Sequence, residues 1–162
     1  MSDLTAKAHH VATALKGTTL GCAESLTAGL VTSSLASVPG ISEILRGGVV
    51  CYATDIKWQV LGVDKSLLAR HGPVHPQVAA QLARGAARVL GAEFGLATTG
   101  VAGPGSAWGK EAGTVFVAAA RGHHLLVREL TIEGDRERVR TISAGAALDL
   151  VASLGEQLES PS

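Results

Sequence analysis

Segments with helical periodicity alternate with short apolar runs along this chain, and the alternation restricts the folds it can form. Residues 3–16 and 76–90 place apolar side chains three or four positions apart, as amphipathic helices do. Short apolar segments without that period, such as 94–99, read as buried strands. Helices and strands alternate in the first part of the chain, and two strands follow each other directly near its end. This order predicts an α/β fold with a mixed sheet and helices on both faces.

The expected boundaries follow from capping residues and helix breakers. Gly17 ends the first helix, Pro39 requires the second to stop before it, and Asp64 suits the N-cap of a short helix. The predicted strands are 18–23, 47–53, 94–99, 114–120 and 125–132. The predicted helices are 3–16, 26–37, 55–62, 64–71, 76–90 and 135–158, the last with Gly145 as a candidate break.

Charge and composition exclude several classes of protein. The 162 residues carry 14 basic and 14 acidic side chains, so no basic surplus supports nucleic-acid binding through phosphates. No apolar run is long enough to span a membrane, and the first residues lack the apolar region of an export signal. Cys22 and Cys51 form no CxxC pair, so a reduced protein of the cytoplasm is expected.

The six histidines do not form a metal-binding pattern. His71 and His75 have the spacing of a zinc-binding helix, but Gly72 and Pro73 between them break any helix there. The other four form adjacent pairs, whose side chains point to different sides, and no acidic cluster accompanies them. The sequence therefore predicts no metal site.

A glycine-rich segment, 100–110, directly follows the predicted strand 94–99. It is not a P-loop, because Glu111 follows Lys110 where Ser or Thr is required, and no helix follows as in a dinucleotide-binding motif. Backbone N–H groups in such a loop can approach an anion where side chains would obstruct. We therefore expect a ligand-binding loop, the alternative being a flexible connection between strands.

The residue patterns alone do not identify a nucleophile. Ser25 lies between a predicted strand and a predicted helix, but the G-x-S-x-G motif is absent, so a helix cap is the simpler role for Ser25 or Thr27. Thr54 and Lys57 have the spacing of a Ser-x-x-Lys motif, without the companion motifs of the β-lactamases. The residues by themselves indicate an α/β domain with a ligand-binding loop.

Eight short blocks, in their order and spacing, resemble the CinA C-terminal domain family. They are AESLTAGL (23–30), VPGIS (38–42), GGVVCYATDIK (47–57), LGV (61–63), HGPV (71–74), TGVAGPG (99–105), GTVFVA (113–118) and GDRERVR (134–140). The resemblance covers nearly the whole chain, so residues 1–162 are expected to form a single domain, as a stand-alone version. It implies a three-layer α/β/α sandwich around a mixed, mostly parallel sheet of about five strands.

The enzymatically active members of this family are nicotinamide mononucleotide deamidases (PncC). The resemblance therefore implies hydrolysis of the carboxamide of nicotinamide mononucleotide (NMN), giving nicotinate mononucleotide and ammonia, in pyridine-nucleotide recycling. It also implies a serine–lysine dyad without metal or cofactor. The expected partners are the small-molecule substrate and a second copy of the chain in a dimer, with no nucleic acid and no membrane.

Carried over residue by residue, the family pattern assigns the site. The nucleophile falls on Ser42 and the general base on Lys57, and Tyr52, which opens the same stretch, is expected as a third catalytic residue. Arg136 and Arg140 lie one helical turn apart at a helix start, an arrangement that favours a phosphate monoester. The positions expected to bind substrate are Thr99, Gly100, Ala102, Gly103, Arg136, Arg140 and Ser25.

The proposed base must be neutral to accept a proton, so the pKa of Lys57 must fall from about 10.4 toward 7–8. Burial and a nearby positive charge both lower the pKa of a lysine. Arg46, Arg136 or the pyridinium of the substrate are candidates for that charge. The ordinary alternatives are a helix cap for Ser42 and a solvated surface lysine for Lys57.

Three segments depart from the family pattern. Ile41 stands where a first serine is usual, Gly105-Ser106-Ala107-Trp108 replaces an Asp-Gly-Gly, and Lys110-Glu111-Ala112 replaces a Lys-Pro-Val. The dyad positions are present, whereas the loop expected to shape the pocket is altered. Two alternatives follow: a non-catalytic nucleotide- or partner-binding domain with the same fold, and hydrolysis of another small amide.

Overall fold

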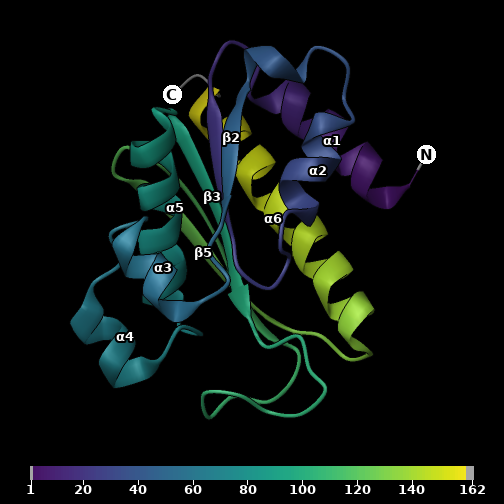
Figure 1. The fold of residues 1–162 in the computed structure, drawn as a ribbon. Helices are drawn as coiled ribbons and strands as arrows, with labels where there is room; N and C mark the ends of the chain where they lie inside the picture. The colour runs from purple at the N-terminus through teal and green to yellow at the C-terminus, as the bar shows by residue number, and fades with distance from the viewer. Residues whose placement is uncertain (1, 160–162) are drawn as a thin grey trace.

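A single five-stranded sheet forms the middle layer of the computed structural model, which describes residues 2–159 (Figure 1). The strand order is β2-β1-β3-β4-β5. β1 is parallel to β2 and β3, while β4 is antiparallel to β3 and β5. The strands are β1 Leu20–Glu24, β2 Leu45–Val50, β3 Phe94–Gly100, β4 Thr114–Arg121 and β5 His124–Thr131. The predicted α/β fold with a mixed sheet is confirmed.

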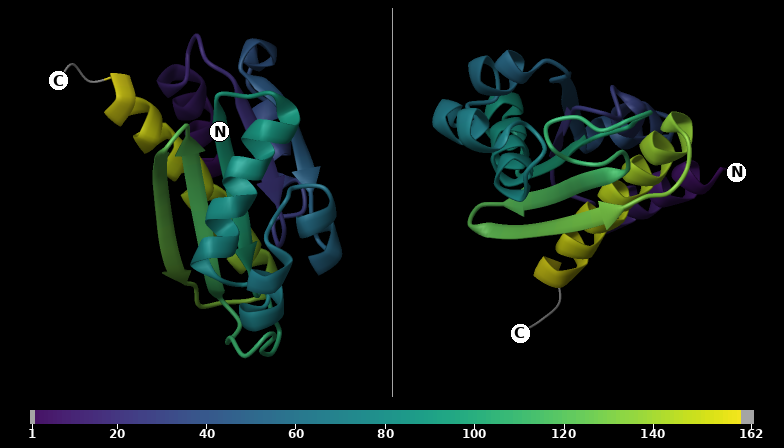
Figure 2. Two further views of the ribbon diagram at one scale, coloured as in Figure 1. Left: turned by 90° about the vertical axis from the view of Figure 1, so that its left-hand side faces the viewer. Right: turned by 90° about the horizontal axis from the view of Figure 1, so that it is seen from below.

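Helices cover both faces of this sheet, as predicted. α1, α2 and α6 pack on one face, and α5 packs on the other with α3 and α4 beside it (Figures 1 and 2). Their bounds are α1 Asp3–Ala14, α2 Leu30–Ala36, α3 Thr54–Gln59, α4 Lys65–His71, α5 Pro76–Leu90 and α6 Arg136–Glu159, with a 3₁₀ turn η1 at Ile41–Glu43. α6 continues through Gly145 without a break. No helix within residues 2–159 combines the length and apolar character needed to cross a bilayer.

The two faces of β3 differ in side-chain size. Phe94 and Leu96 belong to the core under α6, whereas Ala97 belongs to the core under α5. Gly95 also faces α5, because a Cβ built on it would lie only 1.8 Å from the carbonyl oxygen of Ala83. α5 therefore packs directly against the backbone of the central strand.

Adding one methyl group at this contact tests the packing. We expect Gly95→Ala to lower the free energy of unfolding by about 1–3 kcal/mol, because α5 must move away from the sheet. Gly145→Ala in α6 is the control: its Cβ would meet the flexible end of Lys7, at 3.3 Å, and alanine favours a helix. Urea denaturation measures both, and equal losses would contradict the close packing of α5.

Candidate active site

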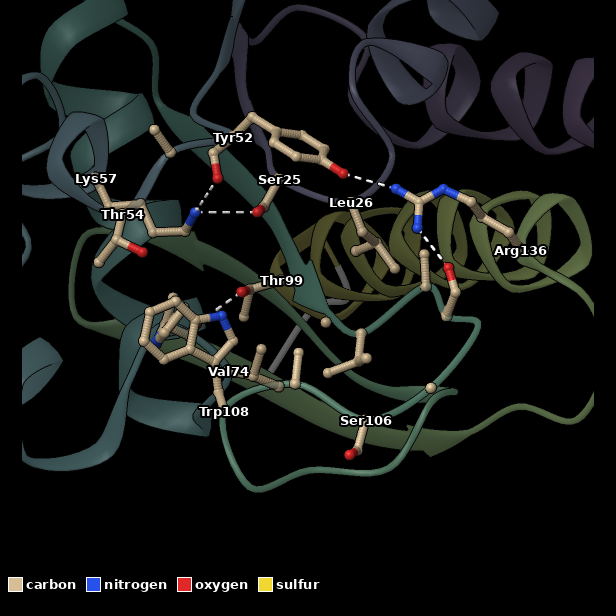
Figure 3. A pocket seen from close by; sticks show the side chains of 18 of the residues that line it. Ser25, Leu26, Tyr52, Thr54, Lys57, Val74, Thr99, Ser106, Trp108 and Arg136 are labelled. Atoms are coloured by element: carbon tan, nitrogen blue, oxygen red, sulfur yellow. Dashed lines mark hydrogen bonds between the residues drawn. The ribbon is translucent and has the colours of Figure 1, made fainter.

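A pocket of about 370 Å³ opens at the edge of the sheet where the parallel strands end (Figure 3). Ser25 follows β1, Tyr52 and Lys57 follow β2, and Thr99 lies near the end of β3. Ligand sites of parallel sheets form outside the carboxyl ends of strands whose connections leave toward opposite faces. The pocket is lined by Ser25, Leu26, Tyr52, Ala53, Thr54, Lys57, Pro73, Val74, Thr99, Gly100, Val101, Ala102, Gly103, Pro104, Gly105, Ser106, Ala107, Trp108 and Arg136.

Lys57 lies in the wall of this pocket with only 1% of its surface exposed. Its Nζ donates hydrogen bonds to Ser25 Oγ at 3.0 Å, to the Cys51 carbonyl at 2.6 Å and to the Tyr52 carbonyl at 3.2 Å. Burial lowers the pKa of Lys57. A neutral amine has two N–H groups and one lone pair, so the two carbonyls can engage both N–H groups while the lone pair faces Ser25.

Ser25, rather than Ser42, is the hydroxyl beside Lys57. Ser42 lies exposed in η1, before β2 begins, whereas Lys57 follows the end of β2. The six residues of β2 set these two ends roughly 20 Å apart, at ~3.3 Å per residue. The structure does not bring Ser42 and Lys57 together, and Ser42 does not line the pocket. The expected pair is therefore corrected to Ser25 and Lys57.

A buried carboxylate that sequence reasoning missed holds the turn carrying Ser25. Glu24, 1% exposed, accepts four hydrogen bonds from the residues that follow. The donors are Thr27 Oγ1, Val31 N, Thr32 N and Thr32 Oγ1, at 2.6–2.9 Å. These bonds cap the start of α2, so the predicted helix 26–37 begins later and the residues after Ser25 form a turn.

Arg136 lies on the side of the pocket opposite Lys57 (Figure 3). Its Nη2 donates to the Tyr52 hydroxyl at 2.7 Å and its Nη1 to the Gly103 carbonyl at 2.5 Å. No other arginine lines the pocket within the part of the chain that the structure describes. Arg136 thus lines the pocket and links the segment after β2 to the loop after β3, while its binding of an anionic ligand stays a prediction.

Arg140 has a different position from the one expected. Its Nε and Nη2 donate to the carbonyl oxygens of Leu26 and Thr27, at 2.9 and 3.1 Å, and it does not line the pocket. The guanidinium therefore holds the turn after Ser25 to α6. A solvent-facing arginine one turn after Arg136 would have been free for a phosphate, but this one is engaged by backbone carbonyls.

The glycine-rich segment after β3 supplies the third side of the pocket. Thr99, Gly100, Ala102 and Gly103 all line it, and their role in binding a ligand stays a prediction. Thr99 Oγ1 donates to the Pro73 carbonyl at 2.7 Å, so this hydroxyl fixes the neighbouring loop. Among residues 2–159, no acceptor pairs with the backbone N–H of Ala102 or Gly103. These two donors are therefore available to an anionic or carbonyl group.

The cysteines offer no competing nucleophile. Cys22 and Cys51 are both free and buried. Burial raises the pKa of the Cys22 thiol to about 12, and it raises the pKa of Cys51 although Lys57 lies nearby. No group of three or more metal-ligating side chains gathers anywhere in the described chain. The pocket instead holds a hydroxyl and a buried amine within hydrogen-bond distance of each other, Ser25 Oγ and Lys57 Nζ.

Known proteins are similar to this chain in both sequence and fold. A family model of the CinA C-terminal domain matches residues 3–154. The chain belongs to the CinA C-terminal domain family. A CinA-like protein of Frankia casuarinae is 46% identical over 136 residues, which is 84% of this chain and 31% of that protein. A putative competence-damage inducible protein of Bacillus subtilis is 39% identical over 142 residues, 88% of this chain and 34% of that protein.

This CinA domain spans about a third of the length of those curated relatives. Solved structures match it over nearly their full length. The competence/damage inducible protein CihA from Agrobacterium tumefaciens superimposes with a TM-score of 0.90 at 32% identity, covering 95% of this chain and 96% of that one. The competence damage-inducible protein A from Klebsiella pneumoniae gives 0.89 at 29% identity, covering 99% and 100%.

Proposed function

We propose that this CinA domain is an amidohydrolase that converts NMN to nicotinate mononucleotide and ammonia. One observation carries the proposal: the buried Nζ of Lys57 lies 3.0 Å from Ser25 Oγ in a pocket that also holds a guanidinium. An amine with a lowered pKa beside a hydroxyl is the arrangement needed to activate a serine. The choice of NMN comes from the resemblance to the family's deamidases.

The reaction proceeds through an ester on Ser25. Ser25 Oγ attacks the carboxamide carbon while Lys57 Nζ accepts the hydroxyl proton. Lys57 then passes this proton to the amide nitrogen, the C–N bond breaks, and ammonia leaves. Water attacks the resulting ester as Lys57 accepts a proton from it. Return of that proton to Ser25 Oγ releases the acid and restores the dyad.

The developing oxyanion needs hydrogen-bond donors near Ser25. The N–H of Leu26 immediately follows the nucleophile and has no acceptor among the described residues. In α/β-hydrolases the residue after the nucleophile supplies such a donor. The unpaired N–H groups of Ala102 and Gly103 are the other candidates. A single donor of this kind is worth about 2.7–4 kcal/mol in the transition state.

The charges around the pocket suit a pyridine mononucleotide. Arg136 can bind the phosphate, because its guanidinium reaches the pocket and meets no carboxylate there. At the other end, the positive pyridinium next to Lys57 favours the neutral form of the amine. The substrate therefore helps to lower the pKa of its own catalytic base.

Ammonia release by the purified protein tests the proposal. NMN, nicotinamide riboside and nicotinamide are compared at equal concentration, and NMN is expected to react fastest because it alone carries the phosphate. A rise in melting temperature with NMN but no ammonia would instead indicate the non-catalytic nucleotide-binding domain. Ammonia from other small amides at higher rates would reject NMN as the substrate.

Removal of the guanidinium tests phosphate binding. Arg136→Ala is expected to raise the KM for NMN by about 10–100-fold, because charged hydrogen bonds worth about 1.5–3 kcal/mol are lost. The KM for nicotinamide riboside should rise less, because this ligand loses only the support that Arg136 gives to Tyr52 and Gly103. Arg138→Ala, an exposed arginine of the same helix that does not line the pocket, is the matched control. An equal rise in KM for the riboside would contradict a phosphate site at Arg136.

A further inference from the structure

The aromatic side chains of this chain are distributed unevenly. The sequence has two Trp, one Tyr and two Phe. Both Phe side chains are buried in the cores, and Trp58 is partly buried with Lys65 Nζ 3.8 Å from its ring centroid. Tyr52 and Trp108 are the two that expose more than half of their surface, 56% and 59%, and both line the pocket. The uncovered aromatic surface is thus concentrated at one site.

The backbone holds Trp108 in an unfavourable conformation. Ala107 and Lys110 exchange two hydrogen bonds, at 3.0 and 2.9 Å, which closes a two-residue turn around Trp108 and Gly109. Both central residues have positive φ, 55° and 71°. Turns of this kind favour Asn, Asp or Gly at the first position, so a bulky side chain there is unusual. Conformational strain of this sort occurs at ligand sites, where the side chain has a use.

A neighbouring loop supports the indole ring. A Cβ on Gly72 would lie 3.3 Å from Trp108 Cε3 and 3.4 Å from its Cβ, so part of the side chain rests against the glycine backbone. In Figure 3, Trp108 lies on the side of Lys57 and Thr99, and Arg136 lies across the pocket from it. In this view the ring therefore lies on the same side of the pocket as Lys57, across from the candidate phosphate site.

We propose that Trp108 is a stacking surface for the ring of the substrate, and that it selects nucleotides whose ring is flat and positively charged. This inference rests on the proposed function, since it names what the pocket recognises beyond the carboxamide and phosphate. No Asp or Glu of the described chain lines the pocket, so a cationic ring finds no carboxylate there. The face of an indole ring attracts such a cation, and stacking adds to the attraction.

Two substitutions separate stacking from support of the loop. Trp108→Asn removes the ring while suiting the positive φ of the turn, and Trp108→Phe keeps a smaller ring. Binding is measured by calorimetry in a Ser25→Ala background, so that turnover is minimised. We expect Trp108→Asn to raise the Kd for NMN by about 5–150-fold, and Trp108→Phe to raise it only a few-fold.

Two further ligands identify the interaction. Ribose 5-phosphate lacks the ring, so its Kd should be unchanged by Trp108→Asn. The reduced form of NMN has a neutral, non-aromatic ring, so it should bind more weakly than NMN and lose little on Trp108→Asn. Equal weakening of all three ligands would show that Trp108 only supports the loop, and no weakening of NMN would overturn the proposal.

The outcomes also separate this inference from the proposed reaction. Binding of NMN that depends on Trp108, without ammonia release by the native protein, would leave the stacking site intact and reject the amidohydrolase. Ammonia release with a KM unaffected by Trp108→Asn would support the amidohydrolase and reject the stacking site. Fluorescence gives a direct signature: in a Trp58→Phe variant, Trp108 is the remaining tryptophan, and NMN should quench its emission while ribose 5-phosphate should not.

Discussion

With alanine in place of Ser25, ammonia release from NMN is expected to fall by roughly 10³–10⁶-fold, the range seen when a serine hydrolase loses its nucleophile. Ser25 Oγ is the hydroxyl within hydrogen-bond distance of Lys57 Nζ, at 3.0 Å. The methyl side chain of alanine has no hydroxyl that Lys57 Nζ could deprotonate. Initial rates of ammonia formation measure the loss, and calorimetry checks that NMN still binds.

Ser42→Ala is the matched control, because it also removes a serine hydroxyl, but from an exposed position at the other end of the strands. This variant should retain the full rate. Loss of activity in Ser42→Ala with an active Ser25→Ala would reverse the assignment of the nucleophile. Full activity in both variants would reject a serine mechanism for this pocket.

Replacement of Lys57 by methionine is expected to reduce the rate by about 10²–10⁴-fold, the usual contribution of a general base. In the native protein, kcat/KM should rise with pH while Lys57 loses its proton and then level off. Because burial lowers the pKa of Lys57, this limb lies below the ordinary lysine range. A kcat/KM that stays constant with pH up to the ordinary pKa range of lysine would contradict Lys57 as the base.

The lowered pKa also predicts a stability effect that does not depend on activity. Between the folded pKa of Lys57 and its unfolded value near 10.4, the unfolded chain binds more protons than the folded one. The free energy of unfolding of the native protein should therefore rise with pH in that window, relative to Lys57→Met. Urea denaturation across the window measures the difference, and parallel curves for the two proteins would exclude a lowered pKa.

The fold could be predicted from the sequence because the apolar periodicity and the helix-breaking residues indicate the same helix boundaries. The predicted helix 76–90 has the bounds of α5, because Pro76 suits a first helical position and the apolar residues keep helical spacing up to Leu90. In the structure, Gly91 ends this helix in the left-handed conformation. The start of α2 was predicted too early for a specific reason. Glu24 caps that helix through a long side chain from within β1, and no local pattern of residues reveals such a bond.

The family pattern and the order of the predicted elements favour different serines as the neighbour of Lys57. Ser25 follows the predicted strand 18–23 and Lys57 follows 47–53, and the ends of parallel strands meet at one edge of a sheet. Ser42 precedes the predicted strand 47–53, so it lies where the parallel strands begin, at the opposite end from Lys57. The predicted elements place Ser25 beside Lys57 only if the two strands are parallel, and tertiary contacts rather than local residue patterns decide how strands pair.

Arg136 and Arg140 lie one turn apart on α6, and each contacts a different part of the site. Arg136 reaches the pocket, while Arg140 binds the backbone carbonyls just after Ser25. Both guanidinium groups extend from one continuous helix, so α6 ties the pocket wall at Arg136 to the backbone that follows Ser25, and a movement of this helix would shift both parts of the pocket together.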